Sequence, residues 1–265
     1  VYMQPSYDGV ITPEILKQYL SDSTRLVSVI LANNEIGTIQ PIRELCKVAH
    51  ERGALFHTDA VQAIGHIPIN VTELGIDMLS ASAHKFNGPK GVGFLYVRQG
   101  TNIVVDGRRR RGARADGGAQ ENGYRAGTEN VAAIVGMATA LRSNCSRLEE
   151  NIKHIKLLEA RLLNELREAQ IPFLRNGNDN RLPGLISLSF AGADGEAILH
   201  RMDLMGISIS TGSACDSVNT EISHVLNAIR LDKKLAKGTI RISLGKYNTE
   251  EDVRAITAAL KKIIT

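Results

Sequence analysis

Residues 26–59 read LVSVILANNEIGTIQPIRELCKVAHERGALFHTD, and this stretch decides the fold class. It begins with a nearly all-apolar, β-branched run, 26–31, which is typical of a strand buried on both faces. Pro41 then opens a helix that Gly53 closes. A second short apolar run, 55–58, follows at once. A strand, a helix and another strand in succession predict a sheet covered by helices.

The same alternation continues along the rest of the chain. We expect further strands over 77–81, 93–97, 185–190, 207–210 and 239–244. We expect further helices over 14–20, 130–169 with an interruption near 143–146, 195–204, 220–228 and 250–264. Residues 100–128 show no period and predict a long loop. The fold class is therefore α/β, with a mainly parallel large domain over 1–145 and a smaller α+β domain over 146–265.

Composition excludes several classes of protein. With 265 residues, 43% hydrophobic, 23% charged and a net charge of +4, the chain is neither disordered nor fibrous. Its cysteines, Cys46, Cys145 and Cys215, form no CxxC pair, which argues against a disulfide framework or a structural metal site and favours a reducing compartment. No apolar stretch approaches the roughly 20 residues that a membrane span requires. Because it begins at Val1 rather than Met, we expect the chain to start within a longer protein.

Polar residues gather after the predicted strands, where open α/β sheets bind their ligands. Lys85 follows one of these strands, and a desolvated lysine there can form a Schiff base with an aldehyde. The alternative is that Lys85 and Lys90 are solvated loop lysines. Asp59 ends another strand, where a buried carboxylate needs a partner such as a pyridinium nitrogen. Its alternative role is the N-cap of a helix over 60–64.

Together, Lys85 and Asp59 match the two side chains that hold the cofactor in a pyridoxal-phosphate enzyme. The lysine binds the aldehyde carbon, and the carboxylate keeps the ring nitrogen protonated. Ser82 and His84 flank the lysine and are able to donate hydrogen bonds to a phosphate. Taken alone, His84 also fits an ordinary core or loop histidine.

Two residues of the second half are candidates for the reaction itself. Arg241 interrupts an apolar strand, and its planar fork suits a substrate carboxylate, although alternation along an edge strand also accounts for it. Cys215 lies in a small, polar, loop-like segment, as expected of an exposed nucleophilic thiol. Cys46 and Cys145 fall in helical patterns and are predicted to be packing residues.

Six motifs, in this order and over essentially the whole chain, resemble the cysteine desulfurases of the NifS/IscS type. They are 33-NNEIG-37, 57-HTDAVQ-62, 82-SAHKFNGPKG-91, 125-RAGTEN-130, 213-SAC-215 and 239-TIRISLG-245. The resemblance implies a homodimeric, fold-type-I pyridoxal-phosphate transferase of the class V aminotransferase family.

The resemblance also implies a role for each matched residue. Lys85 binds the cofactor covalently and, with His84, carries protons. Asp59 pairs with the pyridine nitrogen, and Gln62 and Asn34 address the side of the ring that carries the hydroxyl. Ser82 and His84 hold the phosphate, while Thr128 reaches the phosphate of the neighbouring subunit. Arg241, with Asn34, binds the substrate carboxylate.

The implied reaction converts L-cysteine to L-alanine and leaves the sulfur on Cys215 as a persulfide. The acceptor is then an iron–sulfur scaffold protein or a thiolation partner, in the cytoplasm or an organellar matrix. Another class V enzyme, such as a selenocysteine lyase or a small-acid aminotransferase, is the alternative enzyme. A non-catalytic, scaffold-binding fragment is the alternative of another class.

Two departures from the family pattern stand out. The family's N-terminal segment, with a phosphate loop and a ring-stacking histidine, does not precede Val1, so we expect a truncated piece or a pocket completed by another chain. The run Arg108–Arg111 either attracts an acidic partner, transfer RNA or a scaffold, or is simply solvated. With 4% aromatic residues and no stacking platform, the sequence argues against nucleic-acid binding as the main function.

Overall fold

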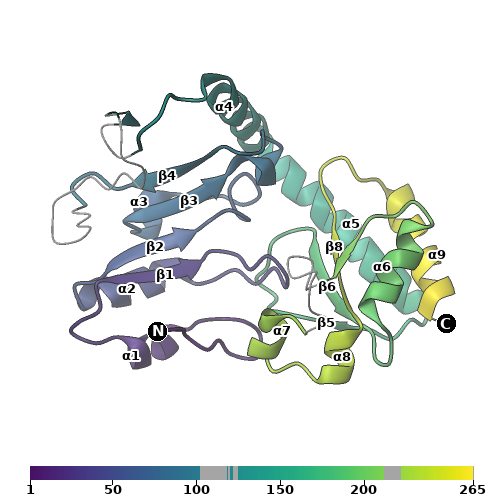
Figure 1. Cartoon of the computed structure of the whole chain (residues 1–265). Helices are drawn as coiled ribbons and strands as arrows, with labels where there is room; N and C mark the ends of the chain where they lie inside the picture. Colours follow the sequence, from purple (N-terminus) through teal and green to yellow (C-terminus); the bar gives the residue numbers. More distant parts are fainter. Residues whose placement is uncertain (102–117, 119, 122–124, 212–221, 265) are drawn as a thin grey trace.

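The computed structural model describes residues 1–101, 118, 120–121, 125–211 and 222–264. Within these residues the elements form two groups, each built on its own four-stranded sheet (Figure 1). Cys215 and the run Arg108–Arg111 lie outside the described residues.

The first sheet has the strand order β1-β2-β3-β4. Strands β1 (Leu26–Ile30), β2 (Leu55–Asp59) and β3 (Met78–Ser82) run parallel, and β4 (Gly93–Val97) pairs antiparallel with β3. Helix α2 (Ile42–Glu51) contacts β1 and β2, and α1 (Pro13–Tyr19) and the short α3 (Val71–Leu74) pack beside it. The predicted α/β class with a mainly parallel first sheet is therefore confirmed.

The second sheet is antiparallel, in the order β5-β6-β8-β7. Its strands are β5 (Leu174–Arg175), β6 (Leu185–Ser189), β7 (Ser210–Thr211) and β8 (Thr239–Ser243). A separate apolar core joins this sheet to α5 (Leu148–Glu168), α6 (Gly195–Asp203) and α9 (Glu250–Ile264). Two short helices, α7 (His224–Ala228) and α8 (Lys233–Lys237), pack around Ile36.

The helical stretch expected over 130–169 is interrupted as predicted, at Arg147 rather than at 143–146, and so forms two helices, α4 (Val131–Ser146) and α5. The apolar core of the first sheet includes side chains of α4, whereas the core of the second includes side chains of α5 from Ile155 onward. The domain boundary between 145 and 146 stays a prediction.

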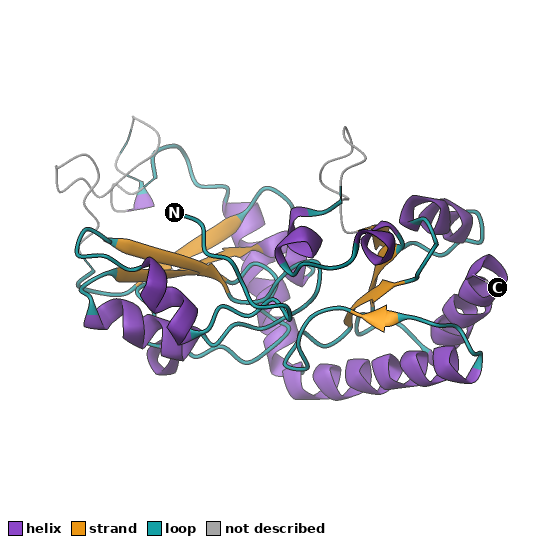
Figure 2. Cartoon of the chain, turned by 90° about the horizontal axis from the view of Figure 1, so that it is seen from below, coloured by secondary structure: helices purple, strands orange, loops and turns teal. Residues whose placement is uncertain are grey.

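Loops cross between the two sheets, as the view from below shows (Figure 2). The segment 33–40, which follows β1, meets the segment 176–182 of the second group. Thr38 forms a β-bridge with Arg181, and the Ile39 amide donates to the Asn180 carbonyl at 2.9 Å. Across the described ranges, no helix has the length and apolar character that crossing a membrane demands.

Candidate active site

Asp59 and Ser82 end neighbouring parallel strands of the first sheet. Asp59 is the last residue of β2, Ser82 is the last of β3, and the register pairs Asp59 with Ser80. Because side chains alternate between the two faces of a strand, Asp59, Ser80 and Ser82 share one face. This is the face opposite the fully buried side chains of Phe56 and Thr58. The carboxylate and the hydroxyl thus lie together at the carboxyl ends of the strands, as predicted.

His57 braces the same face of the sheet. Its Nδ1 lies 2.8 Å from the Ser28 hydroxyl and its Nε2 lies 2.7 Å from the Ser80 hydroxyl, so the ring ties β2 to both neighbours. Burial lowers the pKa of His57, and the negative charge of Asp59 opposes that effect. His57 was not among the predicted site residues. The spacing His57-Thr58-Asp59 could have indicated it, because residues two apart in a strand face the same way as each other.

The helix that Asp59 was alternatively expected to cap does not form, since residues 60–64 make turns. Asp59 Oδ1 instead accepts the Val61 amide at 2.9 Å. In the described part of the chain, Oδ2 accepts no hydrogen bond and remains available to a ligand. Gln62 lies half-buried in the same turn.

Lys85 and His84 lie in a short 3₁₀ turn, η1 (Ala83–Phe86), directly after β3. The Ser82 hydroxyl and His84 Nδ1 are 2.8 Å apart, so these two predicted phosphate ligands contact each other. Lys85 is exposed, as is Lys90, and its amine has no partner among the described residues. Its carbonyl accepts a hydrogen bond from His66 Nε2 at 2.8 Å. The described residues therefore fix the backbone at Lys85 but neither bind nor desolvate its amine.

Arg241 joins the second sheet to the loop after β1. It lies in β8, between β6 and β7, so the edge-strand explanation for this arginine is wrong. Its Nη1 donates to the Asn34 carbonyl at 2.9 Å. Asn33 shapes the same loop, because its Oδ1 accepts the amides of Glu35 at 2.8 Å and Ile36 at 3.0 Å. The two predicted substrate-binding residues are thus in contact.

Glu35, next to Asn34, is a buried carboxylate that the sequence analysis did not single out. The Ser223 hydroxyl donates to it at 2.5 Å. Burial raises the pKa of Glu35, while the Ser223 hydrogen bond and the charges of His224 and Arg241 pull it downward. Ser223 lies just after residues 212–221.

Thr128 is exposed just before α4, and within the described residues no hydrogen bond or ion pair connects it to Lys85 or Asp59. The predicted packing role of Cys46 is confirmed. Its thiol is buried and donates to the Gly75 carbonyl at 3.1 Å, and burial raises its pKa to about 11. The same prediction is wrong for Cys145, which is exposed on α4.

The side chains at these strand ends fit a pyridoxal-phosphate group chemically. They supply an unpartnered amine, a carboxylate with one free oxygen and a hydroxyl–imidazole pair. Lys85, Asp59, Ser82 and His84 are the residues that would hold it. A metal ion has no comparable site, because the described ranges contain no group of three or more His, Cys, Asp or Glu side chains arranged around one point.

Comparisons with known proteins identify the family of this chain. The family model for aminotransferase class-V matches residues 1–256. The chain is 47% identical over 264 residues to the cysteine desulfurase IscS of Dictyoglomus turgidum, covering 99% of this chain and 65% of that relative. It therefore spans just under two thirds of the length of that relative.

Solved structures show the same fold. A NifS-like protein superposes with a TM-score of 0.88 at 37% identity, covering 99% of this chain and 67% of the other. SspA in complex with cysteine superposes with a TM-score of 0.74 at 33% identity, covering 94% and 67%. The chain belongs to the aminotransferase class-V family.

Proposed function

We propose that this protein is a pyridoxal-phosphate-dependent cysteine desulfurase. It converts L-cysteine to L-alanine and transfers the sulfur to Cys215. The similarity to a relative named cysteine desulfurase and to a structure holding cysteine supports this reading. Pyridoxal phosphate is proposed as the cofactor because the side chains at the strand ends supply the groups that would hold it.

The contact between Arg241 and Asn34 carries the proposal. A substrate amino acid needs its carboxylate held near the lysine that reacts at its amino end. Arg241 comes from the second sheet, yet its Nη1 bonds the loop that follows β1, next to the β2 strand that ends at Asp59. Guanidinium forks bind carboxylates in a bidentate manner, so this arginine is suited to orient an α-amino acid here.

The cofactor, when bound, withdraws electrons from the substrate Cα and so makes the sulfur transferable. Asp59 Oδ2 would hold the proton on the ring nitrogen, and the Ser82–His84 pair would bind the phosphate. Lys85 Nζ would take the proton that leaves the substrate Cα. His84 Nδ1 is engaged with Ser82, which leaves Nε2 to carry a proton.

Cys215 completes the reaction as nucleophile. Its thiolate attacks the substrate sulfur, a new S–S bond forms, the C–S bond breaks, and the substrate carbon takes up a proton to give alanine. Ser210 and Ser223, which precede and follow the segment that contains Cys215, both lie near Arg241 or its contact with Asn34. Ser210 is paired in register with Arg241, and Ser223 bonds Glu35, the neighbour of Asn34.

The protein is proposed to act as a homodimer that hands sulfur to an acceptor or scaffold protein in the cytoplasm or an organellar matrix. Apolar side chains on α4 support a partner subunit, because Val131 and Val135 are 65% and 58% exposed. Thr128 precedes this helix, which fits its expected role at the cofactor phosphate of the neighbouring subunit.

Replacing Cys215 with Ser tests the proposal. We expect the protein to keep its visible cofactor absorption, with borohydride fixing the cofactor to Lys85 in a peptide map, but to lose persulfide and sulfide production from cysteine. Cys145→Ser is the matched control, since that thiol is exposed, and it should retain activity. Undiminished sulfide release from Cys215→Ser would refute the desulfurase.

The same assay separates the alternatives. Selenocysteine as substrate yields alanine without Cys215 if the protein is a selenocysteine lyase, and a keto acid product indicates an aminotransferase. A protein that binds no cofactor even with excess pyridoxal phosphate is the non-catalytic scaffold-binding fragment.

A further inference from the structure

A cavity of about 430 Å³ lies against α5 and the loop that follows β5. It is lined by residues of the second group, away from the strand ends that carry Lys85 and Asp59. Its lining contains four cationic and two anionic side chains: Lys156, Arg167, Arg175, Arg181, Glu159 and Asp179. The cavity is therefore positively charged overall.

Arg181 is buried with little compensation for its charge. Its side chain is only 7% exposed. Nη1 donates to the Asn176 carbonyl at 3.0 Å, and Nη2 reaches Asp179 at 3.3 Å, although the Asp179 side chain is fully exposed. Burial, and then the charge of Arg175, lower the pKa of Arg181. A buried guanidinium is costly unless it is paired and hydrogen-bonded, and the one ion-pair partner of Arg181 among the described residues is the solvent-exposed carboxylate of Asp179.

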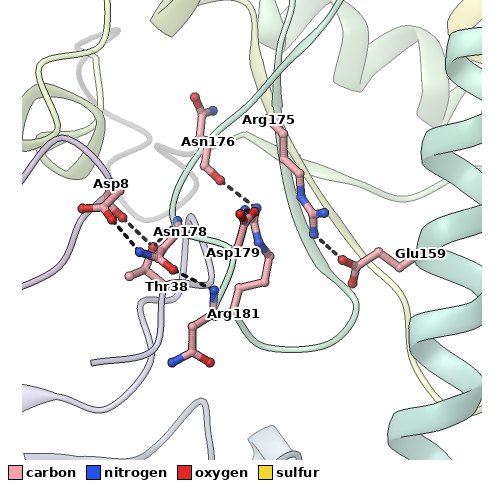
Figure 3. A network of polar contacts seen from close by, with 9 residues as sticks. Asp8, Thr38, Glu159, Arg175, Asn176, Asn178, Asp179 and Arg181 are labelled. Carbon is pink, nitrogen blue, oxygen red and sulfur yellow. Dashed lines mark hydrogen bonds and ion pairs between the residues drawn. The ribbon is translucent and has the colours of Figure 1, made fainter. Parts of the chain in front are cut away.

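The charge of Glu159 raises the pKa of Arg181, but Glu159 forms no ion pair with Arg181, because both of its carboxylate oxygens are engaged elsewhere (Figure 3). One carboxylate oxygen pairs with Arg175, and the other accepts the Gly184 amide at 2.8 Å. Arg175 Nε is itself buried without a hydrogen-bond partner within the described residues. The lining thus has one unused donor, Arg175 Nε, as well as excess positive charge.

The wall of the cavity is built in advance. Asn178 fixes the loop that carries Arg181. Its backbone N–H donates to Thr38 Oγ1 at 3.0 Å, and its side-chain amide donates to Asp8 Oδ2 at 2.5 Å (Figure 3). A hydrogen bond from Ser6 lowers the pKa of Asp8. Arg181 is therefore held in place before any ligand arrives, which reduces the ordering cost of binding.

At the rim, α5 presents two exposed cations. Lys156 has no ion-pair partner in the described part of the chain. Arg167 donates to the neutral Asn164 side chain at 3.0 Å and lies over the Phe173 ring. Both remain able to contact an anion that enters the cavity.

We propose that this cavity binds a small oxyanion, with Arg181 at the buried end and Lys156 and Arg167 at the rim. Carboxylate and phosphate groups share the required chemistry, since both accept paired hydrogen bonds from a guanidinium. The cavity volume falls in the range of small-molecule sites. This site is independent of the proposed desulfurase reaction.

Calorimetric titration of the full protein, loaded with pyridoxal phosphate to fill the Ser82–His84 site, tests the proposal. Inorganic phosphate and tricarballylate are titrated separately at constant ionic strength. We expect one saturable site for at least one probe, and the probe that binds identifies phosphate or carboxylate as the ligand group. Binding should weaken at least about tenfold in Arg181→Gln and in the double variant Lys156→Gln/Arg167→Gln.

Lys153→Gln is the matched control, because this exposed lysine lies on α5 one turn before Lys156 and does not line the cavity. It should bind as the unmodified protein does. The double variant is decisive if Arg181→Gln fails to fold, since the rim cations are exposed. The proposal is overturned if neither probe saturates below about 10 mM, if the double variant binds normally, or if binding is lost in Ser82→Ala instead.

Discussion

The two faces of strand β2 differ in what they do. Phe56 and Thr58 are fully buried on the face that packs against α2, whereas His57 and Asp59 are half-buried on the other face. One strand thus supplies both an apolar core and a row of polar groups. Because side chains alternate along β2, the residues that stabilise the fold and the polar residues of the candidate site lie on opposite faces of the same strand. Substitutions one residue apart should therefore have different consequences.

The largest effect is expected on the polar side, at Lys85. Lys85→Ala should lower sulfide production from cysteine by more than about 10⁴-fold, because the amine is proposed both to bind the cofactor and to move a proton. The free energy of unfolding should not change, since the side chain is exposed. Activity, visible absorption and urea denaturation are the measurements. Lys90→Ala, at another exposed lysine shortly after this turn, serves as control. Full activity in Lys85→Ala would show that the polar face of the sheet does not take part in the reaction.

The buried side should respond in the opposite way. Phe56→Ala is expected to cost about 3–5 kcal/mol of unfolding free energy, because it empties a fully buried site. Leu95→Ala lies on β4 and is 56% exposed, so it should change stability by less than about 0.5 kcal/mol. Chemical denaturation of the two variants gives the comparison. Equal losses of unfolding free energy in Phe56→Ala and Leu95→Ala would show that the polar face of the sheet is covered as fully as the apolar face.

A smaller effect is expected at Arg241. Arg241→Lys keeps the charge but loses the planar fork, so KM for cysteine should rise about 10- to 100-fold with a smaller change in kcat. Arg201→Lys is a control in the same half of the chain, where the side chain only bonds carbonyls of α9. An unchanged KM in Arg241→Lys would remove this residue from substrate binding.

The smallest effect concerns pH and Glu35. Burial raises its pKa in the folded protein, so the folded state binds this proton more tightly than the unfolded chain. Its stabilising contribution is therefore complete below the unfolded pKa of about 4.3 and is lost as pH rises through the folded value. Glu35→Gln should flatten that decline in urea denaturation curves measured from pH 4 to 8. Parallel pH profiles for the two proteins would contradict this.

Local patterns predicted the elements of the first sheet well. The run 26–31, the Pro41-to-Gly53 helix and the residues after each strand carry their signals within a few positions, so β1, α2 and the polar strand ends were foreseeable. Short elements were not. Helices α3 and α8, with four and five residues, make little more than one helical turn, and strand β5 has two residues, so none of them is long enough to show its own period. The strand expected over 207–210 is the pair Ser210–Thr211, set by its pairing with β8.

The candidate site was predicted residue by residue but not in its contacts. Nothing in the spacing places Arg241 in a central strand or on the Asn34 carbonyl, because strand order arises from long-range pairing. Cys145 lies in a helix as expected, yet its exposure depends on which side of α4 is covered. The charged cavity was not predicted, because each of its residues is ordinary in the sequence. Only the burial of Arg181 in the structure reveals it.

The loop 33–40 sets an order for folding. Its partners Asn178, Ser223 and Arg241 lie 140 to 207 positions later in the chain. Chains fold from the N-terminus as they are synthesised, so strands β1 to β4 have all their pairing partners long before this loop does. The contact between Asn34 and Arg241 therefore forms only after β8 has been synthesised, later than the pairing of β1 to β4.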